Sequence, residues 1–96
     1  MDLTEYRKRI DEVDDELLRL FIERMSIGRE IAAYKREHGL PVLDSAREKE
    51  KLIGMENKAI DIAGPEMGQY ANRLFTLLME LNRDYQTVII YNMPHS

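Results

Sequence analysis

Apolar residues recur at alternating steps of three and four over the first third of the chain, which is the spacing of one face of an α-helix. The positions that share this face are Leu3, Tyr6, Ile10, Val13, Leu17, Leu20, Ile27, Ile31 and Tyr34. No proline interrupts this range. The pair His38-Gly39 then favours a helix end, and Pro41 prevents the helix from resuming at once. The pattern predicts a helix over about residues 3–37.

Two further stretches of helical spacing follow. Ser45 and Glu48 have the spacing of a capping box, which predicts a second helix over about residues 45–60. Residues 61–65, DIAGP, form a second break. A third helix is predicted over about residues 66–91, with its apolar face at Met67, Tyr70, Leu74, Leu77, Leu81, Tyr85 and Val88. No stretch alternates in the manner of a strand, so residues 1–96 are predicted to form a single all-α domain of three helices, long, short and long.

The first predicted helix is too long for one small domain to cover. About 33 residues at 1.5 Å each give a rod of about 50 Å, whereas a compact chain of this size has a radius of gyration near 13 Å. The apolar stripe nevertheless continues from one end of the rod to the other. Because a second copy must then cover what the first cannot, we expect an intertwined helical-bundle homodimer.

Composition and charge argue against several other classes. The chain has no cysteine, its N-terminal residues are polar and acidic, and no apolar run approaches the roughly 18 residues of a membrane span. We therefore expect no membrane association and a cytoplasmic location. The net charge of −4 argues against nucleic acid as a partner, because binding to a phosphate backbone needs a basic surface. A local cluster of cations could still bind a small anion.

Two cations lie on or near the apolar face of the first helix. Arg24 takes the place of an apolar residue between Leu20 and Ile27. Lys35 lies eleven residues later, which is within about 20° of Arg24 around an ideal helix. A buried cation needs an anion nearby. Arg24 could pair with a glutamate of the protein, or its stem could pack while its head reaches water. Alternatively, both cations face a bound anionic ligand.

Polar residues interrupt the third helix in a similar way. Asn82 and Gln86 lie on one strip with apolar residues at steps of three or four. They either form a hydrogen-bonded pair in the core or the dimer interface, or donate to a ligand through their amides. At the start of the second helix, Asp44, Arg47 and Glu48 are explained either as capping and solvated residues or as part of the same polar interior.

Arg7 and the two histidines complete the candidate residues. Arg7 lies 17 residues before Arg24, about 25 Å away along the helix, so it is either a surface residue or part of another chain's pocket. His38 falls in a turn and His95 in the C-terminal tail, so neither is expected to bind a metal. We expect neither a metal nor a nucleophile. The polar interior is suited to binding a small polyanion without covalent catalysis.

These residues occur in three segments that resemble the all-helical chorismate mutases, YRKRIDEVDDELLRLFIERMSIGREIAAYK, PVLDSAREKE and RLFTLLMELNRDYQ. The resemblance covers roughly residues 3–90. It implies a cofactor-free, homodimeric isomerase that converts chorismate into prephenate for the synthesis of phenylalanine and tyrosine. The rearrangement is intramolecular, so catalysis would consist of holding the dianion in its reactive conformer and stabilising charge on the ether oxygen.

The resemblance also implies roles for individual residues. Arg7 would reach a substrate carboxylate across the dimer interface, and Arg24 would hold a carboxylate from within the same subunit. Lys35 would contact a carboxylate and the ether oxygen, to which Gln86 would also donate. Lys35, Gln86 and Arg24 are therefore the expected catalytic residues.

Four more residues are expected to bind substrate. Arg47 resembles a further arginine of the pocket, and Asp44 and Glu48 resemble residues near the substrate hydroxyl. Asn82 is a departure from the family, because serine is common at this position, although asparagine can still donate a hydrogen bond.

Two other functions fit part of the pattern. An isochorismate-pyruvate lyase on the same scaffold would need a similar cationic pocket. A non-catalytic dimerisation or regulatory module would keep the helices but have no use for buried cations, and carboxylates of the protein would neutralise its Arg24 and Lys35. The sequence leaves open whether the chain is a free enzyme or a domain excised from a fusion protein.

Overall fold

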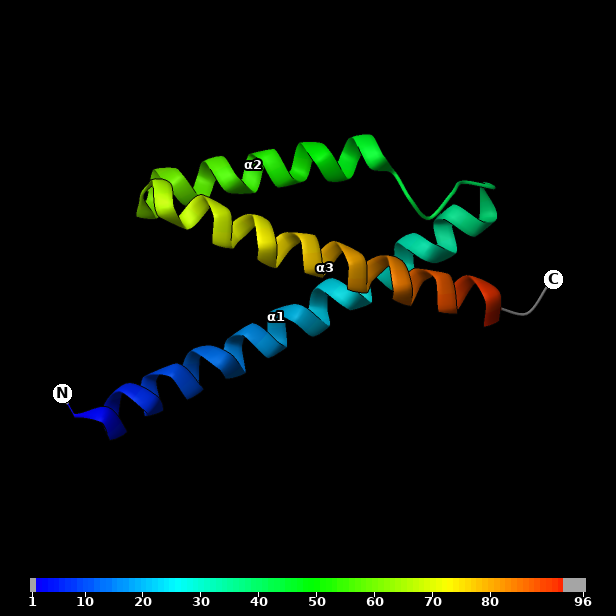
Figure 1. Ribbon diagram of the computed structural model, residues 1–96. Coiled ribbons are helices and arrows are strands. Elements are labelled where there is room, and N and C mark those ends of the chain that lie inside the picture. The colour runs from blue at the N-terminus through cyan, green and yellow to red at the C-terminus, as the bar shows by residue number, and fades with distance from the viewer. Residues whose placement is uncertain (1, 93–96) are drawn as a thin grey trace.

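The protein is built from three α-helices joined by two connections (Figure 1). The computed structural model describes residues 2–92, and their side chains as far as residue 90. Helix α1 spans Leu3–Glu37, α2 spans Ser45–Ala63 and α3 spans Pro65–Asn92. The predicted fold class, all-α with a long, a short and a long helix, is confirmed. The predicted C-terminal tail, with His95, lies outside the described residues.

Short polar side chains cap the first two helices at their N-termini. Asp2 accepts a hydrogen bond from the backbone N–H of Glu5 at 2.9 Å, and Asp44 accepts one from the backbone N–H of Arg47 at 3.0 Å. Each satisfies a backbone N–H that has no partner within its helix. Asp44 rather than Ser45 is therefore the cap of α2, and the side chain of Glu48 is left for another partner.

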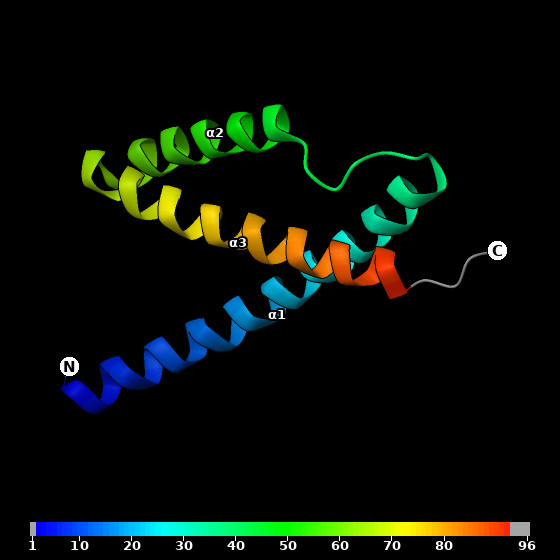
Figure 2. The ribbon, with the colours of Figure 1, turned by 45° about the vertical axis from the view of Figure 1, so that its right-hand side comes forward.

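The connection between α2 and α3 is a single glycine. Helix α2 continues past Ile60 to Ala63, beyond the end that the DIAGP break suggested. Gly64 adopts a φ of 97°, which side chains disfavour, and its N–H donates to the carbonyl of Ile60 at 2.8 Å. Pro65 follows as the first residue of α3, where its missing N–H costs nothing. The chain therefore reverses abruptly, and α2 and α3 form an antiparallel hairpin (Figures 1 and 2).

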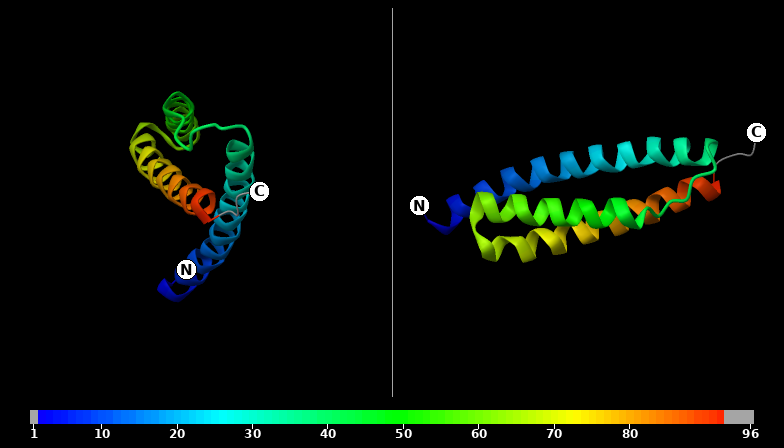
Figure 3. Two further views of the ribbon diagram at one scale, coloured as in Figure 1. Left: turned by 90° about the vertical axis from the view of Figure 1, so that its right-hand side faces the viewer. Right: turned by 90° about the horizontal axis from the view of Figure 1, so that it is seen from above.

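Helix α3 is the central element, since it contacts both α1 and α2, whereas α1 and α2 do not contact each other within the described residues. The C-terminal part of α1 crosses the C-terminal part of α3, and the N-terminal part of α1 extends away from the hairpin (Figures 1 and 3). No helix within residues 2–92 is long and apolar enough to cross a membrane.

A single chain has almost no hydrophobic core. Ala32 and Met79 are the only apolar side chains of the described part that are buried, and every residue from 2 to 20 is exposed. The radius of gyration is 16.8 Å, against about 12.5 Å for a compact chain of this length. The stripe of apolar residues along α1, from Leu3 to Tyr34, thus lies mostly uncovered.

Candidate active site

A cavity of about 580 Å³ lies where α1 and α3 cross, with α2 as its third wall. Seven of the eight predicted site residues line it: Arg24, Lys35, Asp44, Arg47, Glu48, Asn82 and Gln86. Three helices and the α1–α2 connection contribute them, so residues far apart in the sequence meet at one place. The eighth residue, Arg7, does not line this cavity.

Helices α1 and α3 run in the same direction through the site. Arg24 on α1 contacts the backbone of Leu78 on α3, and further along both helices Lys35 contacts Gln86. Between these contacts Gly28 is buried against Asn82, and a Cβ on Gly28 would lie 2.9 Å from Asn82 Cγ. A larger residue at this position would therefore displace the Asn82 amide, to which Gln86 donates, or separate the two helices.

Lys35 is held by two acceptors of the protein. Its Nζ donates to the carbonyl of Val42 at 2.6 Å and to Gln86 Oε1 at 3.3 Å. An ammonium group has three N–H donors, so one is left for a ligand in the cavity. The bond to Val42 also fixes the α1–α2 connection to the end of α1.

The Gln86 amide has a defined orientation. The residue is 6% exposed, its Oε1 accepts from Lys35, and its Nε2 donates to Asn82 Oδ1 at 2.6 Å. A reversed amide would place Nε2 against the ammonium and Oε1 against Asn82 Oδ1, which would be repulsive at both ends. One N–H of Nε2 and both N–H groups of Asn82 remain as donors.

Arg24 is half-buried, and among the described residues its guanidinium contacts a backbone carbonyl and no carboxylate. Its Nη1 donates to the backbone carbonyl of Leu78 at 3.4 Å. Within the described part of the chain, no carboxylate forms an ion pair with Arg24 or Lys35. The interpretation in which a glutamate of the protein balances Arg24 is therefore wrong for the described residues.

The cavity carries a positive formal charge. The cavity is lined by five cations, Arg24, Lys35, Arg47, Lys51 and Arg83, and by two carboxylates, Asp44 and Glu48, so its formal charge is +3. The chain as a whole carries −4. Cations are thus concentrated in a concave and partly buried place, where their field attracts a small anion. No group of three His, Cys, Asp or Glu residues among those described could hold a metal ion.

Two charged residues of the cavity were missed by the sequence analysis. Lys51 lies four residues after Arg47, so helical spacing could have placed it on the same face of α2. Arg83 follows Asn82 directly, off the strip of Asn82 and Gln86, and forms an ion pair with Glu48. That partner is 35 residues away on another helix, and spacing alone could not have revealed it.

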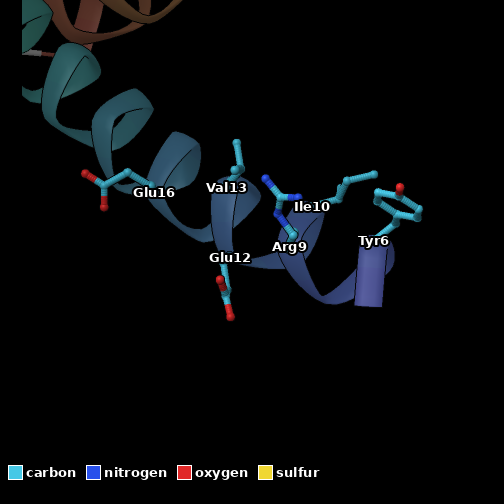
Figure 4. Close-up of a pocket in the computed structure, with 6 residues that line it drawn as sticks. All are labelled: Tyr6, Arg9, Ile10, Glu12, Val13 and Glu16. Carbon is cyan, nitrogen blue, oxygen red and sulfur yellow. The ribbon is translucent and has the colours of Figure 1, made fainter. Parts of the chain in front are cut away.

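The N-terminal half of α1 presents a separate hollow of about 590 Å³ (Figure 4). Tyr6, Ile10 and Val13 point to one side of the helix, whereas Glu12 points the opposite way. In one chain no other helix covers this face. Arg7 is exposed on the same stretch.

Comparison with known proteins shows which family and relatives the chain resembles. The family model for chorismate mutase type II matches residues 6–87. A chorismate mutase of Methanocaldococcus jannaschii is 45% identical over 47 residues, which cover 49% of this chain and 48% of the relative. A bifunctional chorismate mutase/prephenate dehydratase of Aquifex aeolicus is 41% identical over 49 residues, which cover 51% of this chain and 14% of the relative. The matches thus span about half the length of one relative and a small part of the other. No solved structure matches the chain significantly.

Proposed function

Because the chain belongs to the chorismate mutase type II family, we propose that it catalyses the intramolecular rearrangement of chorismate to prephenate. The family match covers most of the chain, and the two relatives bear chorismate mutase in their names. The same activity also explains the chemistry of the cavity, which provides hydrogen-bond donors and positive charge.

The observation that carries the proposal is the pair of cations without carboxylate partners. Arg24 and Lys35 are half-buried, and removing a cation from water without an anion is costly. Chorismate is a dianion, so its carboxylates would supply the missing countercharge. A purely structural helical module would neutralise such cations internally or replace them with apolar residues.

The reaction step needs donors at the ether oxygen. As its C–O bond stretches, negative charge grows on this oxygen. The free N–H of Lys35 and the free N–H of Gln86 would stabilise that charge, and both groups are already held by protein acceptors. A million-fold acceleration needs about 8 kcal/mol, and removal of one such donor typically costs about 3–4 kcal/mol. Restriction of the substrate to its compact conformer would supply the remainder.

The other residues would bind the substrate's polar groups. Arg24 would hold one carboxylate, assisted by the free N–H groups of Asn82. Arg47 would contribute further positive charge. Asp44 and Glu48 would accept from the ring hydroxyl.

We propose that the active form is a homodimer in which Arg7 of the partner subunit completes each cavity. The chain exposes 7703 Å², about 2,000 Å² more than expected of a compact chain of its mass. That excess is in the range of obligate homodimer interfaces. The exposed surface includes the apolar stripe of α1 beside Arg7. The surface that needs a partner therefore also carries the arginine that the cavity of one chain lacks.

Prephenate would then enter the synthesis of phenylalanine and tyrosine, in the cytoplasm. The name of the Aquifex relative combines chorismate mutase with prephenate dehydratase, an enzyme that uses this product.

The direct test is to incubate purified protein with chorismate and identify the products by chromatography. We expect prephenate to form at a rate that is proportional to enzyme and greatly exceeds the spontaneous rate. Arg24→Ala should lose this activity, whereas Arg29→Ala, an exposed residue on the same helix, should keep it. Folded wild-type dimer that leaves chorismate unchanged, or that releases pyruvate from isochorismate instead, would contradict the proposal.

A further inference from the structure

Glu48 has a proposed role at the substrate hydroxyl, whereas its ion-pair partner Arg83 has none. Arg83 on α3 donates from its Nη1 to Glu48 Oε1 on α2, and the two side chains are 33% and 23% exposed. Both residues line the cavity. Within the described residues, this is the only ion pair or side-chain hydrogen bond that joins α2 to α3.

The position of this pair gives it influence over the site. Helix α2 contacts α3 but not α1, so the α2 wall is positioned relative to Arg24 and Lys35 through α3 and the α1–α2 connection. Arg83 and Glu48 join that wall to the helix that also carries Asn82 and Gln86.

Glu48 has a competing partner on its own helix. Lys51 lies three residues later, a spacing at which a glutamate and a lysine can pair on one helix face. Without Arg83, Glu48 would be free to turn toward Lys51. The Glu48 carboxylate alone would also repel a dianionic ligand. The positive charge of Arg83 offsets this repulsion.

We propose that Arg83 is a positioning residue, which holds the Glu48 carboxylate toward α3 and away from Lys51, the other cation of the cavity within its reach. This inference rests on the proposed function, because it assumes that Glu48 accepts from the hydroxyl of bound chorismate. Arg83 itself acts through Glu48 and does not need to touch the substrate.

The experiment compares chorismate kinetics of Arg83→Met, Arg83→Lys, Glu48→Gln and the double variant Glu48→Gln/Arg83→Met. Methionine keeps much of the stem and removes the charge, and Arg73→Met, an exposed arginine on α3, is the matched control. We expect Arg83→Met to lower kcat/KM roughly tenfold, mainly through a higher KM, since the hydroxyl contact exists in the ground state as well. Lysine should restore part of the loss.

The double variant decides between positioning and direct contact. In the Glu48→Gln background, Arg83→Met should change kcat/KM by less than about twofold, because there is no carboxylate left to position. In the Arg83→Met background, Lys51→Met should recover part of the activity, because the competing cation is removed.

Four results would overturn the inference. A tenfold loss in both backgrounds would mean that Arg83 contacts substrate directly. Unchanged kcat/KM with a lower melting temperature would make the ion pair purely structural. If Arg83→Met does not fold, the neutral variant Arg83→Gln replaces it, and wild-type kcat/KM in that variant would again refute positioning. A wild-type protein inactive toward chorismate would instead defeat the proposed function itself, and the positioning role with it.

Discussion

The shared site is tested most sharply by combining two inactive variants, Arg7→Ala and Arg24→Ala. Seventeen residues of helix separate these arginines by about 25 Å, and α1 is continuous over that range, so one chain cannot bring both to one cavity. If Arg7 completes the cavity as proposed, each cavity takes Arg24 from one chain and Arg7 from the other. Either substitution should cost about 3 kcal/mol, or somewhat more than a hundredfold in kcat/KM, because it leaves a bound carboxylate unpaired.

The two variants are unfolded together at equal concentrations, refolded, and assayed for chorismate turnover. Random pairing gives about half heterodimers. In a heterodimer one site carries both defects and the other carries neither. Half of the dimers would then have half of their sites active, so recovered activity should be about a quarter of that of refolded wild type.

The matched control combines Arg24→Ala with Lys35→Ala. These residues line the cavity of one chain, so every site of their heterodimer lacks one of them and no activity should return. If Arg7→Ala and Arg24→Ala also give no recovery, despite heterodimers shown by native mass spectrometry, then Arg7 does not cross the interface and the dimer proposal is wrong.

Four further predictions follow from the same structure. Gln86→Glu should be active only at acid pH, since a protonated carboxyl donates to the ether oxygen and a carboxylate repels it; a pH profile with full activity near neutrality would make Gln86 structural. Gly28→Val should destabilise the protein by about 1–3 kcal/mol in urea unfolding and lower kcat, because the added methyl groups displace Asn82. Sedimentation equilibrium should show no folded monomer at micromolar concentration, and a stable helical species of 11.3 kDa would refute this. Activity should survive a chelator, and its loss and restoration by a divalent ion would show that a metal is involved.

The sequence was sufficient where a contact depends on one helix alone. Asn82 and Gln86 are four residues apart, and the structure joins them by a hydrogen bond. Arg24 and Lys35 share a face because eleven residues complete about three turns, and both line one cavity. In each case the helical repeat alone determines which side chains share a face, and the packing of the other helices does not change it.

The sequence was insufficient where a contact depends on how helices align. Glu48 was assigned to a local capping box with Ser45, whereas Asp44 caps the helix and Glu48 pairs with Arg83. That pairing depends on the register of α2 against α3, which follows from the abrupt turn at Gly64. The DIAGP segment predicted a break but not that one glycine would make it, so the alignment of the two helices could not be derived.

The crossing of α1 and α3 has a consequence for stability as well as for catalysis. The few buried side chains of the described part, Ala32, Met79 and Gln86, lie on these two helices, and two of them line the cavity. So small a core cannot offset the conformational entropy of ordering the chain. We therefore expect the proposed association to supply most of the stability, as in obligate homodimers whose stability depends on protomer concentration. A variant of a cavity residue that weakens the crossing would therefore also weaken the dimer. Its activity should be compared with wild type at several protein concentrations before a loss is assigned to chemistry.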